Sequence, residues 1–149
     1  MMEIRWKIKP FASLTVEELY QTLQLRSEVF VVEQNCVYLD IDGKDPKSLF
    51  LLGVYKNEIV AHARLFDSGV SFENASIGRV VVHPNYRSKK WGYELMQQAI
   101  QGIHDNFGKS EITIGAQLYL KRFYESLGFK QSSEVYLEDG IEHIIMDKK

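Results

Sequence analysis

A run of β-branched residues followed by a basic turn is the part of this sequence best suited to chemistry. Val80, Val81 and Val82 have the composition of a buried strand, and the proline two residues later ends it. A polar turn containing Arg87 follows, and apolar residues then recur at helical spacing, which predicts an amphipathic helix over 89–107. A basic turn at a helix N-terminus presents free backbone N–H groups and partial positive charge, so it predicts an anion site.

A phosphate group is the anion that this turn would hold most easily. Gly92, in the first helical turn, lets a phosphate approach the backbone closely. The turn matches neither common glycine-rich phosphate loop, because G-x-x-x-x-G-K-[ST] and G-x-G-x-x-G are both absent. A plain strand-to-helix connection with a solvated basic turn is the alternative at this point.

The rest of the chain predicts the elements that would position this turn. Thr15 and Glu18 form a capping box, which starts a helix running to about Val31 or Val32. Residues 34–48 are polar and turn-rich, which predicts a long functional or mobile loop. Strands are expected over 4–8, 49–55, 59–66, 75–82, 111–115, 129–136 and 141–147, and a short helix over 117–127. The order β-α-β-β-β-α-β-α-β-β predicts an α/β fold in one domain, residues 1–149.

Composition limits the partners of this chain. A net charge of −2 argues against a general nucleic-acid binder, which usually carries a basic excess. No apolar run approaches 18 residues, and the N-terminus lacks the apolar core of a signal peptide, so no membrane association is expected. Cys36 is the single cysteine, which fits a reducing cytoplasm. The four histidines show no zinc-ligand spacing, so no metal is expected.

Two segments together resemble the signature regions of the GCN5-related N-acetyltransferases, the GNAT family. The segment Arg87-Ser88-Lys89-Lys90-Trp91-Gly92 is similar to the acetyl-CoA motif R/Q-x-x-G-x-G/A, with Lys90 in place of the middle glycine. The segment from Gln117 to Phe129 is similar to N-x-x-A-x-x-[FLM]-Y-x-x-x-G-F, with Gln117 in place of asparagine. Stretches of the front half and the last hairpin resemble the bacterial ElaA subfamily, namely 25–36, 40–45, 77–80, 115–117 and 134–143.

The resemblance implies a mixed, mostly antiparallel sheet with helices on both faces, and an acetyl-CoA-dependent N-acetyltransferase. In such enzymes a primary amine attacks the thioester directly, and the counterpart of Tyr124 protonates the departing thiolate. A bulge in the strand over 75–82 would open the slot for the thioester. The implied cofactor contacts are Val80, Val81, Val82, Arg87, Ser88, Lys89, Lys90, Trp91, Gly92, Tyr93 and Gln117.

The acceptor side is less defined by the sequence. Its candidates are Glu33, Asp40, Asp42, Arg79 and His143, and the acceptor itself is unknown. His83 is a further candidate base, and His62 and Arg64 are expected on an exposed strand face. Ser76 stands where some family members keep an acidic base, so a non-catalytic acyl-CoA-binding or regulatory module is the alternative. A homodimer is left open.

Overall fold

A single mixed sheet forms the centre of the computed structural model, which describes residues 3–149. Its strands are β1 (Arg5–Pro10), β2 (Leu49–Tyr55), β3 (Glu58–Phe66), β4 (Ala75–Val82), β5 (Ile112–Gln117), β6 (Lys130–Gln131), β7 (Tyr136–Glu138) and β8 (Ile141–Lys148). They lie in the order β1-β2-β3-β4-β5-β8-β6, and β7 pairs with β8. Neighbours are antiparallel except β4 and β5, which are parallel. The predicted fold class is confirmed.

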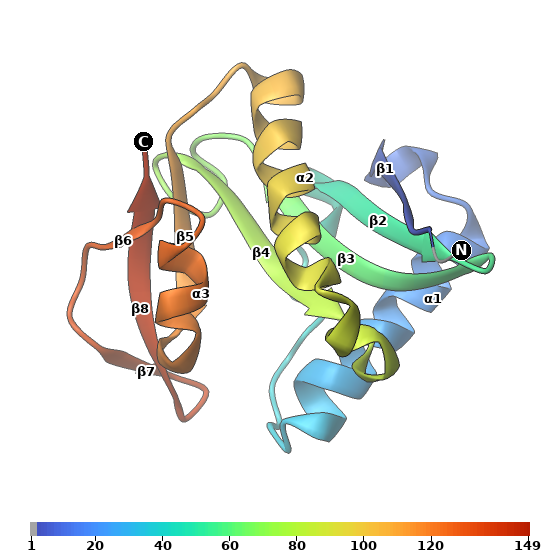
Figure 1. Cartoon of the computed structure of the whole chain (residues 1–149), viewed down its shortest axis with the longest axis horizontal. Coiled ribbons are helices and arrows are strands. Elements are labelled where there is room, and N and C mark those ends of the chain that lie inside the picture. The colour runs from blue at the N-terminus through green and yellow to red at the C-terminus, as the bar shows by residue number, and fades with distance from the viewer. Residues whose placement is uncertain (1–2) are drawn as a thin grey trace.

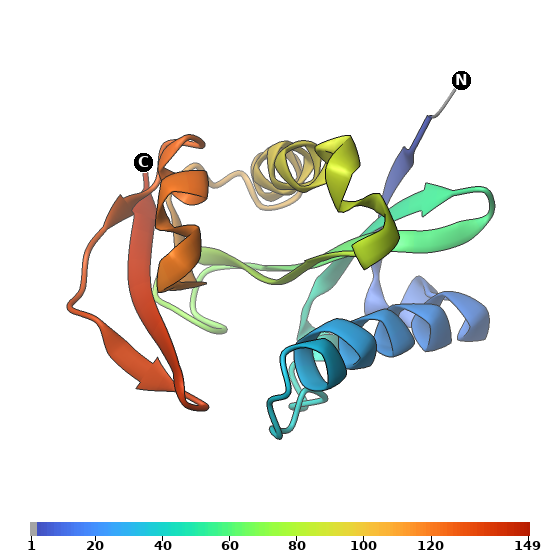
Figure 2. The ribbon, with the colours of Figure 1, turned by 60° about the horizontal axis from the view of Figure 1, so that its bottom comes forward.

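Helices cover both faces of the sheet. The helices are α1 (Val16–Arg26), which continues as a π-helical segment over Ser27–Glu33, α2 (Trp91–Phe107) and α3 (Lys121–Glu125). Short 3₁₀ turns span Phe11–Ser13, Asp45–Lys47, Pro84–Lys89 and Leu118–Leu120. Helices α2 and α3 lie on one face, and α1 with its π-helical extension lies on the other (Figure 2).

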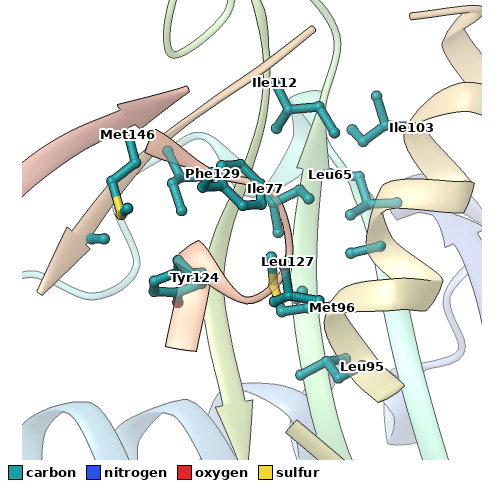
Figure 3. Close-up of a cluster of buried hydrophobic side chains, with 14 of the residues drawn as sticks. Leu65, Ile77, Leu95, Met96, Ile103, Ile112, Tyr124, Leu127, Phe129 and Met146 are labelled. Carbon is teal, nitrogen blue, oxygen red and sulfur yellow. The ribbon is translucent and has the colours of Figure 1, made fainter. Parts of the chain in front are cut away.

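The main core lies between the sheet and the α2 and α3 helices. Figure 3 shows side chains from both helices meeting side chains from several strands. Helix α2 presents Leu95, Ala99 and Ile103 to this core, and all three are fully buried. Gly102 brings the helix close to the sheet, because a Cβ atom there would lie 2.6 Å from the Cδ1 atom of Ile8.

Helix α1 begins at the capping box that the sequence predicts. The Glu18 amide donates to the Thr15 hydroxyl at 3.0 Å, and the Glu18 carboxylate accepts from the Thr15 amide at 2.8 Å. Burial would raise the pKa of Glu18, but hydrogen bonds from Lys7, the Thr15 amide and Lys9 outweigh it and lower that pKa to about 2.

The lowered pKa predicts an acid-sensitive contribution to stability. Because the carboxylate of Glu18 titrates lower in the folded chain than its ordinary 4.5, it stabilises the fold above about pH 4.5, and this contribution is lost as pH falls towards 2. Glu18→Gln should lower the free energy of unfolding at pH 7 by about 1.5–3 kcal/mol and flatten its pH dependence. Urea titrations from pH 2.5 to 7 measure this, with the exposed Glu17→Gln as control. Equal pH slopes for wild type and Glu18→Gln would contradict it.

Strand ends shift by one or two residues from the sequence prediction, and three elements differ more substantially. The strand expected over 129–136 is wrong in its middle, because the Ser133 hydroxyl accepts from the Ile145 amide at 2.8 Å and takes the place of a strand partner. The helix expected from 89 begins at Trp91, since the preceding turn is 3₁₀ over Pro84–Lys89. The helix expected over 117–127 is a 3₁₀ turn followed by the short α3.

Candidate active site

The sheet opens at its only parallel junction among the described residues. Strands β4 and β5 pair at Ala75 with Ile112 and at Ser76 with Thr113, and then diverge. Figure 1 shows β4 running away from β5 towards its C-terminal end. A cleft of about 1120 Å³ fills the space between them, and residues from both strands line it. The backbone edges of two neighbouring strands therefore face this cleft instead of each other.

A bulge in β4 lies beside the opening. Gly78 pairs with Arg64 of β3 and Val81 pairs with His62, so Arg79 and Val80 together stand opposite one β3 residue. Arg79 has φ of +51°, in the left-handed region that few side chains adopt. The bulge implied for this strand is confirmed, and it turns the second half of β4 away from β5.

Buried ion pairs hold the bulge in place. The Nε atom of Arg79 lies 2.7 Å from Asp40 Oδ1, and its guanidinium stacks over the Tyr38 ring at 5.4 Å from the ring centroid. Asp40 also accepts from the Nε atom of Arg26 at 3.0 Å. Arg26 is fully buried, and its Nη1 atom donates to Asp45 at 2.7 Å. The 34–48 loop is thus tied to both α1 and the bulge.

The same network reaches β3, where one prediction is wrong. His62 and Arg64, expected on an exposed face, are 0% and 3% exposed, because α1 and the 34–48 loop cover that face. The Nη1 atom of Arg64 donates to Asp42 at 2.8 Å and to Asp45 at 3.2 Å. Burial would raise the pKa of Asp42, but hydrogen bonds from Arg64 and the Lys44 amide hold that pKa well below its usual range.

Tyr124 projects from α3 into the cleft. Its ring packs edge-on against Phe123 and Phe129, with centroids 5.2 and 6.0 Å apart, and it is 7% exposed (Figure 3). Within residues 3–149 its hydroxyl makes no hydrogen bond, although the side chain lines the cleft. Burial raises the pKa of Tyr124 to about 12, and the nearby Tyr119 adds to the shift. The phenol is therefore a proton donor at neutral pH.

Comparison with known proteins places this arrangement in a family. The family model described as the acetyltransferase (GNAT) domain matches residues 13–149. The chain belongs to the GNAT family. Protein ElaA of Escherichia coli is 42% identical to it over 148 residues, which cover 98% of this chain and 97% of ElaA. The expected resemblance to the ElaA subfamily is confirmed.

Solved structures of related GNAT proteins agree with this assignment. The crystal structure of Escherichia coli ElaA has a TM-score of 0.92 to this chain, covering 99% of it and 100% of ElaA, at 41% identity. An acyl-CoA N-acyltransferase from Pseudomonas aeruginosa has a TM-score of 0.91, covering 97% and 99% of the two chains, at 38% identity. A GNAT acetyltransferase from Elizabethkingia anophelis, solved with acetyl-CoA bound, shares the fold at 18% identity and a TM-score of 0.70, covering 98% of this chain and 97% of its own.

The GNAT motif residues divide into two groups. Val80, Val81, Val82, Arg87 and Gln117 line the cleft, as expected of cofactor contacts. The residues from Ser88 to Tyr93 do not line it; they form the end of the 3₁₀ turn and the first turn of α2. The Trp91 side chain is buried against Tyr55 and Tyr86, so only the backbone of Trp91 could meet a ligand.

The backbone of Lys90 has a conformation that favours glycine, the residue that the GNAT motif has at this position. Its φ and ψ are +62° and 22°, the left-handed conformation that glycine adopts without steric cost. No side chain caps the N-terminus of α2, so the first backbone N–H groups of the helix have no side-chain acceptor there. The departure from the motif therefore changes the residue and keeps a backbone shape suited to an anion.

The predicted acceptor residues are mostly brought together. Glu33, Asp42, Arg79 and His143 all line the cleft, whereas Asp40 lies beneath it in the ion network. His83 caps the 3₁₀ turn by accepting from the Asn85 amide at 3.1 Å, and it does not line the cleft.

Other cleft residues were missed by the sequence analysis. A Cβ atom added to Gly115 would lie 3.4 Å from the Tyr136 hydroxyl and 3.9 Å from the Phe72 ring. These two aromatic side chains therefore cover that part of β5. The alternation of the last hairpin could have indicated Tyr136, but no pattern in the loop singles out Phe72.

Across residues 3–149, no group of three or more histidine, cysteine or acidic side chains is placed to hold a metal ion. Of the helices in this part of the chain, none combines the length and apolar character needed to cross a bilayer.

Proposed function

We propose that this chain is an N-acetyltransferase that takes the acetyl group from acetyl-CoA and transfers it to a primary amine by direct attack on the thioester. The observation that carries the proposal is the uncommitted Tyr124 hydroxyl, which points from α3 into the gap between β4 and β5. A purely structural cleft would not need a protonated phenol at this place. A non-catalytic acyl-CoA-binding module is the competing function.

The cofactor would lie with its pyrophosphate at the start of α2. The uncapped N–H groups of the first helical turn and the side chains of Arg87, Lys89 and Lys90 are suited to that charge. The pantetheine arm is peptide-like and would run along the open edge of β4 as an added strand, bonding backbone groups near Val80 and Val82. The Elizabethkingia relative, which binds acetyl-CoA on the same fold, supports this choice of cofactor.

Chemistry would follow where the two strands part. The thioester carbonyl becomes an oxyanion when the amine attacks, and a backbone N–H near Val81 or Val82 could stabilise it. Tyr124 would then protonate the leaving thiolate, so no covalent enzyme intermediate is required. Since acetyl-CoA and reduced thiols are intracellular, the reaction is proposed to run in the cytoplasm.

A thiol-release assay tests the function directly. The chain is incubated with acetyl-CoA and separately with spermidine, L-lysine, phenethylamine and a peptide with a free N-terminus, and free CoA is measured together with the acetylated amine. Amine-dependent release above the hydrolysis background supports the enzyme. Tight acetyl-CoA binding with no transfer to any amine would instead favour the binding module.

Arg87 offers a prediction on cofactor affinity. Its guanidinium forms a two-point ion pair with Glu33, with distances of 3.0 and 2.6 Å, and this pair lowers the pKa of Glu33. Arg87→Glu should weaken acetyl-CoA binding more than tenfold, which corresponds to about 1.4 kcal/mol, because it removes a phosphate partner and adds repulsion. Glu33→Gln is the matched control and should bind as well as or better than wild type, since Arg87 is released. Calorimetry with unchanged affinity in a folded Arg87→Glu variant would contradict the cofactor site.

A further inference from the structure

The proposed reaction needs a group that removes a proton from the amine. A primary ammonium is protonated at neutral pH and has no lone pair with which to attack the thioester. Ser76 occupies the β4 position where a carboxylate would be the simplest base, and it is a buried hydroxyl. The proton acceptor must therefore come from another wall of the cleft.

Most acidic groups around the cleft are already committed to arginines. Glu33 is bound by Arg87, and Asp42 is bound by Arg64 at 2.8 Å. Both pairs lower the pKa of the carboxyl group, which makes each carboxylate a weak base. Asp40 and Asp45 lie in the buried network with Arg26 and do not line the cleft. The acids of the β7–β8 hairpin, Glu138 and Asp139, are the cleft carboxylates that no arginine binds within residues 3–149.

His143 lies beside those two acids and is oriented for proton transfer. Its side chain lines the cleft and is 8% exposed. Its Nδ1 atom is 2.7 Å from the Ile141 carbonyl, which can only accept, so in the neutral ring Nδ1 carries the proton. The lone pair is then on Nε2, and the carboxylate of Glu138 lies 3.5 Å from that atom. A carboxylate beside Nε2 stabilises the imidazolium that forms when this nitrogen takes a proton.

The hairpin also places His143 on the correct wall. It pairs directly with Gln117 of β5 and with Tyr136 of β7, so the three side chains share one face of the sheet. Two contacts cross the cleft and join this wall to the residues that follow the π-helical segment. The Gln117 amide donates to Gln34 at 3.5 Å, and the Cys36 thiol donates to the Asp139 carbonyl at 3.5 Å. Between these contacts and the bulge, an amine would approach the thioester from the face opposite α2 and α3.

We propose that His143 is the catalytic base, with Glu138 stabilising its protonated form. The inference rests on the proposed N-acetyl transfer. His143 Nε2 takes one proton from the ammonium and passes it through the exposed Glu138 to solvent. The free amine forms the C–N bond, the C–S bond breaks, and Tyr124 gives its proton to the thiolate. The second amine proton restores the Tyr124 phenol, so one proton is released per amide formed.

The decisive measurement is the pH profile of kcat/KM for the best amine of the assay panel. His143→Gln should lower kcat/KM about 100-fold at pH 7, the usual scale for a positioned base. The loss should shrink towards pH 10, where the amine loses its proton unaided. Glu138→Gln should also lower kcat/KM at pH 7, because the imidazolium loses its carboxylate. Tyr136 and Asp139 are the other titratable groups at this hairpin, and neither is altered.

The controls separate this role from a structural one. His104→Gln, on the exposed part of α2, should match wild type at every pH. A structural role for His143 predicts a loss that is equal across the pH range, and that result would overturn the proposal, as would unchanged kinetics. Independently, ¹⁵N NMR should find the Nδ1-protonated tautomer, and an Nε2-protonated ring would also overturn it. If wild type acetylates none of the amines, the result contradicts the proposed N-acetyl transfer itself, and with it the assignment of His143 as the base of that reaction.

Discussion

Tyr124→Phe will lower kcat about 100-fold or more, while acetyl-CoA binds with nearly unchanged affinity. The ring keeps its contacts with Phe123 and Phe129, and only the hydroxyl is removed. Because the proton moves to the thiolate only in the transition state, the loss falls on kcat and leaves cofactor binding intact. Melting temperature, acetyl-CoA affinity and kcat are measured on the same variant.

Tyr20→Phe, on the exposed face of α1, is the control for losing a tyrosine hydroxyl. A lower melting temperature with near-normal kcat would show that Tyr124 is structural. Slow product release could hide the chemical step in steady-state measurements, so single-turnover kinetics completes the test.

Asp45→Ala will destabilise the fold by about 3–5 kcal/mol, the usual loss when one partner of a buried ion pair is removed. Asp45 is 4% exposed and binds both Arg26 and Arg64, so its loss leaves buried guanidinium charge without compensation. Because the same network holds Arg79 in the bulge, acetyl-CoA affinity should fall as well. Urea unfolding and calorimetry measure the two effects.

Asp67→Ala, in an exposed loop, controls for the loss of one negative charge. The double variant Arg26→Met/Asp45→Leu should recover part of the lost stability, since apolar groups can replace a buried ion pair at little cost. An Asp45→Ala variant as stable as wild type would show that the network contributes nothing to the fold.

Local sequence signals predicted most of the elements and several of the residues that line the cleft. The capping box at Thr15 and the valine run before the α2 turn are encoded by neighbouring residues, and they appear where predicted. The β4 bulge followed from the resemblance and agrees with the register of the sheet.

Contacts between residues that lie far apart in the sequence could not be predicted in this way. Arg64 is buried because Asp42 and Asp45 fold over it from a loop about 20 positions away, and no periodicity records that approach. Arg87 pairs with Glu33, 54 positions away in the sequence. A predicted cofactor contact and a predicted acceptor contact therefore form an ion pair with each other. The left-handed Lys90 was identified only as a departure from a motif, since a lysine gives no sign of positive φ.

The short seam between β4 and β5 has a consequence for the behaviour of the unliganded protein in a crowded cell. An unpaired strand edge usually invites strands of other chains and leads to aggregation. Beyond the paired residues, the inner edges of β4 and β5 are unpaired, but they face the cleft inside the sheet, and helices cover both faces of that sheet (Figure 2). A strand of a neighbouring protein would have to enter this cleft in order to pair with either edge. The narrow, flexible pantetheine arm of the proposed cofactor fits such a space more easily. The fold thus leaves unpaired backbone N–H and C=O groups accessible to a small molecule, in a place that strands of other proteins do not easily reach.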